Sequence, residues 1–405
     1  MSKMKILIVT QHFWPEVFPI NEIAKSLIDL GHIVEVLTAC PNYPEGQAFP
    51  GYKAFDIKSE VWAGIKIFRV PLVTRGKHRA LRRIVNYLSF VISGSVFSPW
   101  LLRKKKYDAV FVYAVSPIFQ AIPAIFISWL KKCRTVVWVQ DLWPESLSAM
   151  GVVRNEKILW SIGLIVRWIY RHTDLILTQS EAFIAPVKAL APGSKIIYYP
   201  NSVATFFSEP VKITEPLEVK FLQGFSVLFA GNIGVGQAVE VITDAATLLK
   251  EYTDIHFVLI GQGSRWQWMK DQVEARNLTN VHLLGRFPVE TMPSFMQKAS
   301  ALLVTLADEP IFAQTVPNKV QAYLASGRPI LASLNGEGAR IVTQANAGIA
   351  TPASDAKALA DAVLKLYKMN ETDRAALGQN GKAYFKQHFD HAKLMQDLVT
   401  HLQQF

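Results

Sequence analysis

Short apolar runs alternate with amphipathic stretches along most of this chain, and this alternation constrains its fold more than any other feature. In the first half the apolar runs cover residues 6–10, 33–38, 65–70, 109–113, 135–139 and 175–178. A second series covers residues 226–230, 256–260, 281–284, 301–305 and 329–333. Runs of this length are typical of buried parallel strands. The pattern therefore predicts an α/β fold with helices on both faces of parallel sheets.

The pattern is interrupted over about residues 205–224, where Pro210, Pro216 and several charges replace the periodicity. Such a stretch is typical of a linker between domains. The chain has 405 residues, which exceeds the size at which a single core stops growing. We predict two Rossmann-like domains, over residues 1–204 and 205–389, followed by a terminal helix within residues 390–405.

The net charge of +11 is confined to the first half of the chain. Residues 1–200 hold 25 Lys and Arg against 13 Asp and Glu, whereas residues 201–405 hold 18 against 19. A basic domain favours an anionic partner, such as nucleic acid, an anionic membrane or a diphosphate-bearing substrate. The basic residues flank apolar tracts and match no nucleic-acid-binding motif, so a nucleic-acid partner is disfavoured.

The cysteines and the N-terminus indicate a protein of the cytoplasm. Cys40 and Cys133 lie far apart, beside no His or acidic cluster with metal-ligand spacing, so we expect neither a disulfide framework nor a metal site. The apolar run that begins at Ile6 is too short for a secretory signal and has no small-residue cleavage site after it. It predicts a first buried strand.

Residues 84–102 form an uncharged stretch with Arg82 and Arg83 before it and four basic residues, 103–106, after it. Its length would allow it to span a bilayer, but Asn86 and Gly94 interrupt it and basic clusters lie on both sides. A buried helix with a solvated basic edge is one alternative. The interpretation we favour is an amphipathic helix that lies on an anionic membrane surface.

The segment 317–338 carries the strongest functional signal. Lys319 opens a predicted helix that ends at Gly327, a short apolar run follows, and Asn335-Gly336-Glu337-Gly338 forms a glycine-rich turn. This arrangement presents helix N-termini and backbone amides to an anion. The segment resembles the donor-site signature of the family-4 retaining glycosyltransferases, which have the GT-B fold. The pairs Thr173-Asp174 and Pro200-Asn201 resemble further motifs of that family.

The resemblance implies two Rossmann-like domains that face each other across a cleft, with the terminal helix crossing back to the first domain. It also implies a nucleoside-diphosphate sugar, with UDP as the expected nucleotide, and catalysis without a metal or cofactor. The donor-binding residues expected from these motifs and from the glycine turns are Lys319, Arg265, Asn232, Gly234, Gly263, Glu309, Thr315, Asn318 and Gly336. Surface charge is the alternative interpretation of Lys319 and Arg265.

This chain departs from the family pattern at four donor-site positions. The family commonly has an arginine at the position of Asn232 and a lysine near Gln237, and its two paired glutamates fall on Gln314 and Ala322. Lys319 and Arg265 remain as the cations available for a diphosphate. The lost carboxylates favour an altered donor, and an N-acetylated 6-deoxy sugar would suit neutral and apolar contacts.

The loop after the first strand, residues 11–22, has Phe18-Pro19 where the family usually has two glycines. Together with residues 40–46, it resembles a bacterial surface-polysaccharide branch that includes N-acetyl-L-fucosamine transferases. We expect Glu16 to take part in catalysis and His12, Asn42 and Tyr43 to bind the acceptor. An ordinary proline-rich turn is the alternative.

Asp141 follows the apolar strand that ends at Val139, so its carboxylate is expected at the carboxyl edge of the sheet. There it could accept the proton of an attacking hydroxyl or orient the acceptor. Glu145 is a second catalytic candidate. The alternatives are that Asp141 caps a turn and that Glu145 is a solvated helix residue.

These observations predict a metal-independent, retaining glycosyltransferase. It would move N-acetyl-L-fucosamine or a related sugar from UDP to an undecaprenyl-diphosphate-linked saccharide, in O-antigen, lipopolysaccharide or capsule biosynthesis. We expect peripheral attachment to the cytoplasmic face of the inner membrane. Two alternatives stay open, a catalytically decayed GT-B binding or scaffold subunit and a sugar-nucleotide epimerase.

Overall fold

The computed structural model describes residues 2–76, 80–149, 151, 153–207 and 224–404. The chain forms two compact units. The first unit comprises residues 1–200 together with 392–405, and the second unit comprises residues 201–391. Most of the predicted linker, residues 208–223, lies outside the described residues.

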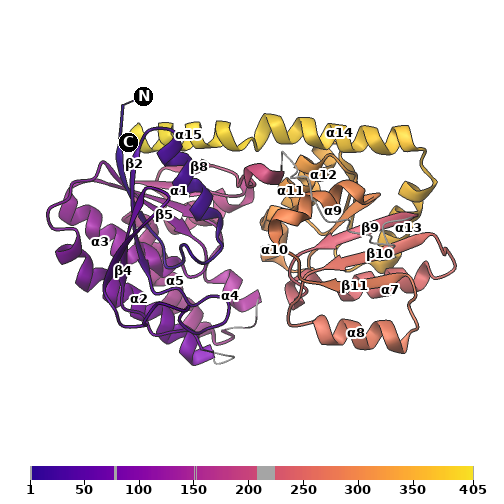
Figure 1. The fold of residues 1–405 in the computed structure, drawn as a ribbon, viewed down its shortest axis with the longest axis horizontal. Helices are drawn as coiled ribbons and strands as arrows, with labels where there is room; N and C mark the ends of the chain where they lie inside the picture. Colours follow the sequence, from indigo (N-terminus) through magenta and orange to yellow (C-terminus); the bar gives the residue numbers. More distant parts are fainter. Residues whose placement is uncertain (1, 77–79, 150, 152, 208–223, 405) are drawn as a thin grey trace. The chain divides into compact units, whose positions relative to one another are not determined.

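The first unit is drawn in indigo to magenta in Figure 1, with α15 in yellow. It is built on an eight-stranded sheet in the order β3-β4-β2-β1-β5-β6-β7-β8. Every neighbouring pair is parallel except β3 and β4, which are antiparallel. The strands are β1 (Lys5–Val9), β2 (Ile33–Ala39), β3 (Lys58–Trp62), β4 (Ile65–Val70), β5 (Ala109–Ala114), β6 (Arg134–Val139), β7 (Leu175–Thr178) and β8 (Ile196–Tyr198). The six strands predicted in this half are confirmed to within one residue at each end.

The helices of the first unit connect these strands. They are α1 (Pro19–Asp29), α2 (Ala80–Leu101), η1 (Ile118–Gln120), α3 (Ala121–Lys131), α4 (Glu145–Ala149), α5 (Glu156–Arg171), η2 (Glu181–Phe183), α6 (Ile184–Leu190) and, from the C-terminal end of the chain, α15 (His391–Gln403). Helix α2 contains the uncharged stretch, and Pro99 lies inside it.

Helix α15 packs on the core of the first unit. Leu394, Leu398 and Leu402 recur at helical spacing and are almost fully buried against residues of β1, β5, β6 and α1. The Tyr199 hydroxyl donates a 2.5 Å hydrogen bond to the Leu394 carbonyl oxygen, and the Trp138 indole N–H donates to the Tyr199 carbonyl. The end of the chain therefore completes the first unit's core.

The second unit is built on a six-stranded sheet in the order β11-β10-β9-β12-β13-β14, and all its neighbouring pairs are parallel. Alternate residues of its strands enter the two apolar clusters on opposite faces of the sheet, as Val227 and Leu228 do. The strands are β9 (Phe225–Ala230), β10 (Ile255–Ile260), β11 (Val281–Gly285), β12 (Ala301–Thr305), β13 (Ile330–Ser333) and β14 (Gly348–Thr351).

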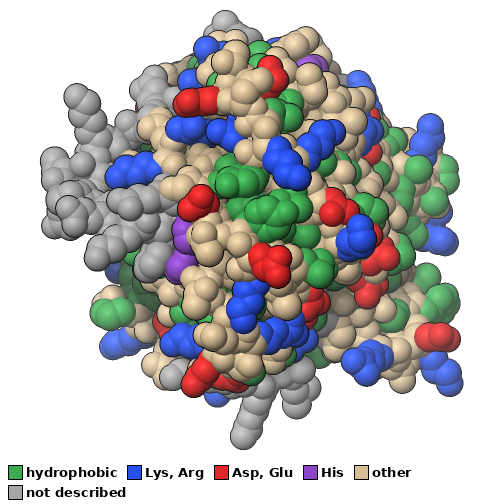
Figure 2. Space-filling model, turned by 90° about the vertical axis from the view of Figure 1, so that its right-hand side faces the viewer, with side chains coloured by type: hydrophobic (Ala, Val, Ile, Leu, Met, Phe, Trp, Pro, Cys, Tyr) green, Lys and Arg blue, Asp and Glu red, His purple; other side chains and the backbone are tan. Residues whose placement is uncertain are grey.

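The helices of the second unit cover both faces of this sheet. They are η3 (Thr205–Phe207), η5 (Val235–Gln237), α7 (Glu240–Leu248), α8 (Trp266–Ala275), η6 (Val289–Thr291), α9 (Met292–Lys298), α10 (Pro310–Gln314), α11 (Asn318–Ser326), α12 (Glu337–Gln344), α13 (Ala356–Lys368) and α14 (Glu371–His388). Helix α11 ends at Gly327, which has φ +70°, so the predicted start and stop of this helix are confirmed to within one residue. On the face drawn in Figure 2, basic and acidic side chains are intermixed.

The sequence pattern missed three strands, β3, β8 and β14, all at sheet edges. Strand β3 is largely exposed, so it lacks the continuous apolar run of a central strand. Strands β8 and β14 are short and only half-buried. Because these edge strands are weakly buried, their sequences lack the apolar runs from which the other strands were predicted.

Candidate functional site

Two glycine turns and the start of α11 meet at the carboxyl end of the second unit's sheet. Gly231 follows β9 and Gly261 follows β10, and the last residues of these strands are paired in register. Both glycines have a positive φ, and a Cβ on Gly261 would lie 1.7 Å from the Gly231 carbonyl oxygen. A Cβ on Gly231 would lie 2.5 Å from Lys319 Cε. Only glycine allows these backbones to approach each other and Lys319 so closely.

The Lys319 ammonium is buried in this corner and has no hydrogen-bond partner among the described residues. Its Nζ lies 3.7 Å from the centroid of the Phe229 ring, which supplies a cation–π contact but no hydrogen bond. Burial lowers the pKa of Lys319 to about 7. A buried cation with three unused donors is costly unless an anion satisfies it, so the corner is prepared for a negatively charged ligand.

Gly263 and Arg265 bring the loop after β10 against the loop after β9. The Arg265 backbone N–H donates to the Ile233 carbonyl, and a Cβ on Gly263 would lie 2.2 Å from that same oxygen. The Arg265 guanidinium pairs with Glu240 at 2.8 Å and lies over the Trp268 ring. Arg265 is therefore partly neutralised in this structure, unlike Lys319.

Asn232 and Gly234 lie in the same corner. The exposed Asn232 side chain donates a 3.1 Å hydrogen bond to Gln237 Oε1, and Gly234 lies directly beside it. Neither Asn232 nor Gln237 supplies the positive charge that the family commonly has here. Lys319 and Arg265 are the cations that the structure brings to the two glycine turns.

The remaining predicted donor residues lie around α10 and the ends of its neighbouring helices. Glu309 precedes α10 and is exposed. The Thr315 hydroxyl donates a hydrogen bond to the Ile311 carbonyl and so helps to terminate α10. Gly336 precedes α12, where a Cβ would lie 1.9 Å from the Ala313 carbonyl oxygen. Asn318, the first residue of α11, accepts a hydrogen bond from the Asn201 side-chain amide.

Helix α10 and the loop that precedes it contact Gly236 of the glycine corner. The Ala307 N–H donates to the Gly236 carbonyl, and the Phe312 ring lies against Gly236. The side-chain oxygen of Gln314, at a position where the sequence resemblance implies a glutamate, is buried and finds no partner in the part of the chain that the structure describes. The Gln321 side-chain amide, one turn after the start of α11, is also buried and is unpaired as far as the described residues are concerned. Sequence reasoning missed Gln321, because its type and spacing resemble those of an ordinary helix residue.

In the first unit, Glu16 holds two loops together. Its Oε1 accepts 2.7 Å hydrogen bonds from the backbone N–H groups of Asn42 and Tyr43, and its Oε2 is 2.9 Å from His12 Nδ1. The Glu16 side chain is almost fully buried. Both carboxylate oxygens are thus used in positioning the loops after β1 and β2, and the predicted catalytic role of Glu16 stays a prediction.

Of the three predicted acceptor residues, Tyr43 alone presents a substantial surface. His12 is buried, with its ring stacked on Phe18 at 4.9 Å between centroids. Asn42 is buried as well, and its side chain bonds to the Cys40 carbonyl and to the N–H of Arg75. Tyr43 is 38% exposed and lies beside the His12 and Phe18 rings. His12 and Asn42 therefore shape the surface that Tyr43 presents.

Asp141 lies at the carboxyl edge of the first unit's sheet, as predicted. Its Oδ2 accepts a 2.8 Å hydrogen bond from the Ser116 hydroxyl and a longer one from the Ser116 N–H. Burial raises the pKa of Asp141, and the two bonds from Ser116 oppose that rise. A carboxylate with a raised pKa is suited to accept or return a proton. Glu145, in contrast, is exposed at the start of α4.

Sequence reasoning missed Ser116, although a signal was available. Ser116 and Asp141 each lie two residues beyond the end of their strands, and the last residues of β5 and β6, Ala114 and Val139, are partners in register. Equivalent positions on adjacent parallel strands must emerge side by side. The Trp143 indole N–H then donates to the Ser116 hydroxyl at 3.1 Å, which extends the network toward α4.

No group of three or more His, Cys, Asp or Glu side chains that could hold a metal ion occurs among the described residues. The positive charge available to an anionic ligand in the second unit's glycine corner comes from Lys319, Arg265 and the N-terminus of α11.

Two family models match successive parts of the chain. Residues 20–202 match the Glycosyl transferase 4-like domain, and residues 224–369 match the Glycosyl transferases group 1 model. Together the two ranges cover most of the sequence. The chain belongs to the group 1 glycosyltransferases of the family-4 type.

Two curated relatives come from bacteria. The putative colanic acid biosynthesis glycosyl transferase WcaI of Escherichia coli is 25% identical, over 80% of this chain and 82% of that protein. The probable glycosyltransferase WbjE of Pseudomonas aeruginosa is 24% identical, over 76% of this chain and 79% of that protein. Both resemble this glycosyltransferase over most of their length.

Solved structures confirm the GT-B fold. Sucrose-phosphate synthase from Thermosynechococcus elongatus matches with a TM-score of 0.76 and 15% identity, over 99% of both chains. The Anabaena protein HepE, solved with UDP and glucose, matches with a TM-score of 0.69 and 15% identity, over 99% of this chain and all of that one. At these identities the likeness establishes the fold alone.

The first prediction concerns the effect of the buried Lys319 ammonium on the free energy of unfolding. Replacing Lys319 with methionine keeps the apolar stem and removes the buried, unpaired charge, so Lys319→Met should raise the free energy of unfolding by about 1–3 kcal/mol at pH 7 or below. Urea denaturation measures this change. Lys357→Met is the matched control, because Lys357 is an exposed helix residue whose replacement should leave stability nearly unchanged. A loss of stability in Lys319→Met would show instead that the buried ammonium stabilises the fold.

The second prediction concerns Glu16. Glu16→Ala leaves two buried backbone N–H groups without an acceptor and should lower the free energy of unfolding by about 2–4 kcal/mol. Glu16→Gln retains one oxygen acceptor and should recover much of that loss. The exposed Glu45 on the neighbouring loop is the control, and Glu45→Ala should be nearly neutral. Full stability in Glu16→Ala would show that Glu16 is not a structural clamp.

Proposed function

We propose that this glycosyltransferase moves a sugar from a nucleoside diphosphate to a lipid-linked saccharide. The observation that carries the proposal is the Lys319 ammonium, which is buried beside the Gly231 turn at the start of α11 and is unpaired within the described part of the chain. A diphosphate supplies the negative charge and the acceptor oxygens that this corner lacks. The backbone of the glycine turns can approach such a group without side-chain interference.

UDP is the nucleotide we propose for the donor. The support is the fold shared with HepE, which was solved with UDP and with UDP-glucose. For the sugar we propose N-acetyl-L-fucosamine or a related N-acetylated deoxysugar. Gln314 and Ala322 replace two carboxylates of the family pattern, and a neutral amide and a methyl group complement the acetamido and methyl groups of such a sugar.

The proposed reaction retains the anomeric configuration and needs no metal. Breaking the anomeric bond places negative charge on the departing diphosphate, and preorganised positive groups lower the barrier most when they face that charge. Lys319, Arg265 and the N-terminus of α11 fill this role. Retention requires the acceptor hydroxyl to approach on the face that the diphosphate leaves, so the diphosphate can take its proton. Asp141 then orients the acceptor.

The acceptor is proposed to be an undecaprenyl-diphosphate-linked saccharide at the cytoplasmic face of the inner membrane, in O-antigen or capsule biosynthesis. Helix α2 is, within the described part of the chain, the one helix that could cross a membrane by length and composition. We propose instead that it lies on the membrane surface. Its exposed Val96 and Trp100, and Trp160 on α5, are apolar, while Arg103 and Lys104 follow α2.

The third prediction tests the transferase function. UDP-linked N-acetyl and deoxy sugars are incubated with and without a polyprenyl-diphosphate-linked saccharide, and product is measured by mass spectrometry. We expect product only with both substrates, and kcat/KM about a hundredfold or more lower in Lys319→Ala. Lys357→Ala is the matched control and should retain activity. Donor binding without any product would favour the decayed binding subunit, and conversion of the donor without an acceptor would favour the epimerase.

The fourth prediction tests the membrane surface. Trp100→Ser and Trp160→Ser should each weaken binding to vesicles of anionic phospholipid by about threefold to tenfold, because each removes an exposed aromatic anchor. Sedimentation with vesicles measures the binding. Leu248→Ser removes a similarly exposed apolar side chain from α7 and should leave binding unchanged. Equal binding by all variants and by wild type would contradict the membrane assignment.

A further inference from the structure

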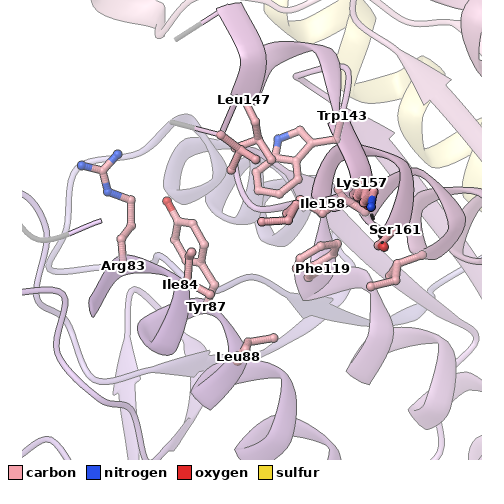
Figure 3. A pocket seen from close by; sticks show the side chains of 13 residues that line it. Arg83, Ile84, Tyr87, Leu88, Phe119, Trp143, Leu147, Lys157, Ile158 and Ser161 are labelled. Carbon is pink, nitrogen blue, oxygen red and sulfur yellow. Dashed lines mark hydrogen bonds between the residues drawn. The ribbon is translucent and has the colours of Figure 1, made fainter. Parts of the chain in front are cut away.

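An apolar pocket of about 400 Å³ lies in the first unit, bounded by α2, η1, α4 and α5 (Figure 3). Its size falls in the range of about 300–1,000 Å³ that is typical of small-molecule sites. The side chains of Tyr87, Trp143 and Ile158 line the same space from different segments of the chain. Neither Lys319 nor Asp141 lines this pocket.

The pocket combines apolar walls with positive charge. Its charged lining residues are Arg83 on α2 and Lys157 on α5, and no carboxylate is among the described residues that line it. Within the part of the chain that the structure describes, the Arg83 guanidinium makes no ion pair and the Tyr87 hydroxyl has no hydrogen-bond partner. Both groups extend in the same direction from α2 (Figure 3). An apolar cavity with a cation and a hydroxyl at its edge matches a ligand that has an apolar tail and an anionic head.

The pocket wall is connected to the candidate acceptor-orienting carboxylate. Trp143 lines the pocket, and its indole N–H donates to the Ser116 hydroxyl, which in turn donates to Asp141. Burial raises the pKa of Tyr87, with Asp141 adding to the rise and the Arg75 and Arg83 cations opposing it. Tyr87 therefore lies within electrostatic reach of both Asp141 and Arg83. A ligand head at the Arg83 edge would be near the Asp141 network.

The pocket is also continuous with the proposed membrane surface. Leu88 and Ile158 line it and are 46% and 51% exposed. Ile92, Val96 and Trp100 follow Leu88 at intervals of four residues, so these exposed apolar side chains continue the surface along α2. A lipid tail could pass from the bilayer into the pocket without crossing a polar surface, which would cost free energy.

We propose that this pocket is the subsite for the polyprenyl segment next to the diphosphate of the acceptor lipid, with the Arg83 guanidinium binding that diphosphate. The inference rests on the proposed function and specifies which part of the chain recognises its acceptor. The volume accommodates the first part of the lipid chain, and the remainder stays in the bilayer. The attached saccharide then extends toward Asp141.

The test compares two acceptors that share one saccharide diphosphate, one carrying a polyprenyl chain and the other a short alkyl group. Both are assayed in detergent solution, so that vesicle binding does not limit the rate. We expect wild type to prefer the polyprenyl acceptor by about tenfold or more in kcat/KM, because only that acceptor fills the pocket. Leu88→Trp and Ile158→Trp narrow the pocket and should reduce this preference to about unity.

Leu130→Trp is the matched comparison, because Leu130 is similarly exposed on α3 and does not line the pocket. It should retain the chain-length preference of wild type. Arg83→Gln should raise KM for both acceptors by about tenfold, since both carry the diphosphate, and Arg83→Lys should restore part of the loss. Urea denaturation of each variant, measured separately, establishes that the first unit is folded.

The outcomes separate this inference from the proposed function. If wild type transfers sugar to both acceptors with equal efficiency, or if the narrowed variants keep the preference, the pocket assignment is overturned and the transferase proposal stands. If wild type binds the donor but uses neither acceptor, the proposed function fails and the pocket assignment fails with it.

Discussion

The buried Lys319 ammonium is the interaction on which the donor corner depends. Placing a cation without hydrogen bonds beside the Phe229 ring costs free energy that folding elsewhere must offset. The surrounding backbone is organised around that charge, since Gly231 leaves the space that the lysine fills and Gly261 allows the next loop to approach Gly231. Such an arrangement is unfavourable for stability alone and favourable for binding an anion. Functional sites are commonly places where stability is lost in this way.

The first unit shows the opposite use of charge. Glu16 is also buried, but both of its oxygens are satisfied, by two backbone N–H groups and by His12. The carboxylate therefore stabilises the loops after β1 and β2 and holds Tyr43 at the surface. Asp141 is intermediate in its hydrogen bonding. Ser116 donates to one of its carboxylate oxygens, and burial raises the pKa of Asp141. Lys319 is thus suited to bind an anion, Glu16 to position loops, and Asp141 to accept a hydrogen bond from a hydroxyl group.

The buried strands and the ends of α11 could be predicted from the sequence. Buried strands such as β4 and β7 were located to the residue, because continuous apolar runs mark them clearly. The start of α11 beside Lys319 and its end at Gly327 were also predicted, since helix ends have local signals. The exposed edge strand β3 was missed because nothing in its residues distinguishes it from a loop.

Contacts between distant residues account for what could not be predicted at the site. The role of Glu16 depends on amides 26 and 27 residues away, and the Trp143–Ser116 bond joins residues 27 apart. No local pattern encodes such pairs. The pairing of Arg265 with Glu240 likewise became visible only in the folded second unit. The order of the strands in each sheet brings these residues together, so their contacts become visible only in the folded protein.

Proton uptake on donor binding tests the central claim about Lys319 most directly. The free enzyme should hold this group about half-protonated at pH 7, because burial lowers its pKa to about 7. A bound diphosphate favours the charged form and raises that pKa, so binding should take up about half a proton at pH 7 and nearly one at pH 8. A UDP-sugar is the appropriate ligand, since its diphosphate exchanges no proton near neutral pH.

Titration calorimetry in buffers of different ionisation enthalpy measures this uptake. We expect it in wild type, with affinity falling as the pH rises above 7, and we expect no such uptake in Lys319→Met, which should also bind more weakly. Tight donor binding by wild type without proton uptake, or equal binding by Lys319→Met, would contradict the assignment of Lys319 as the diphosphate-binding cation.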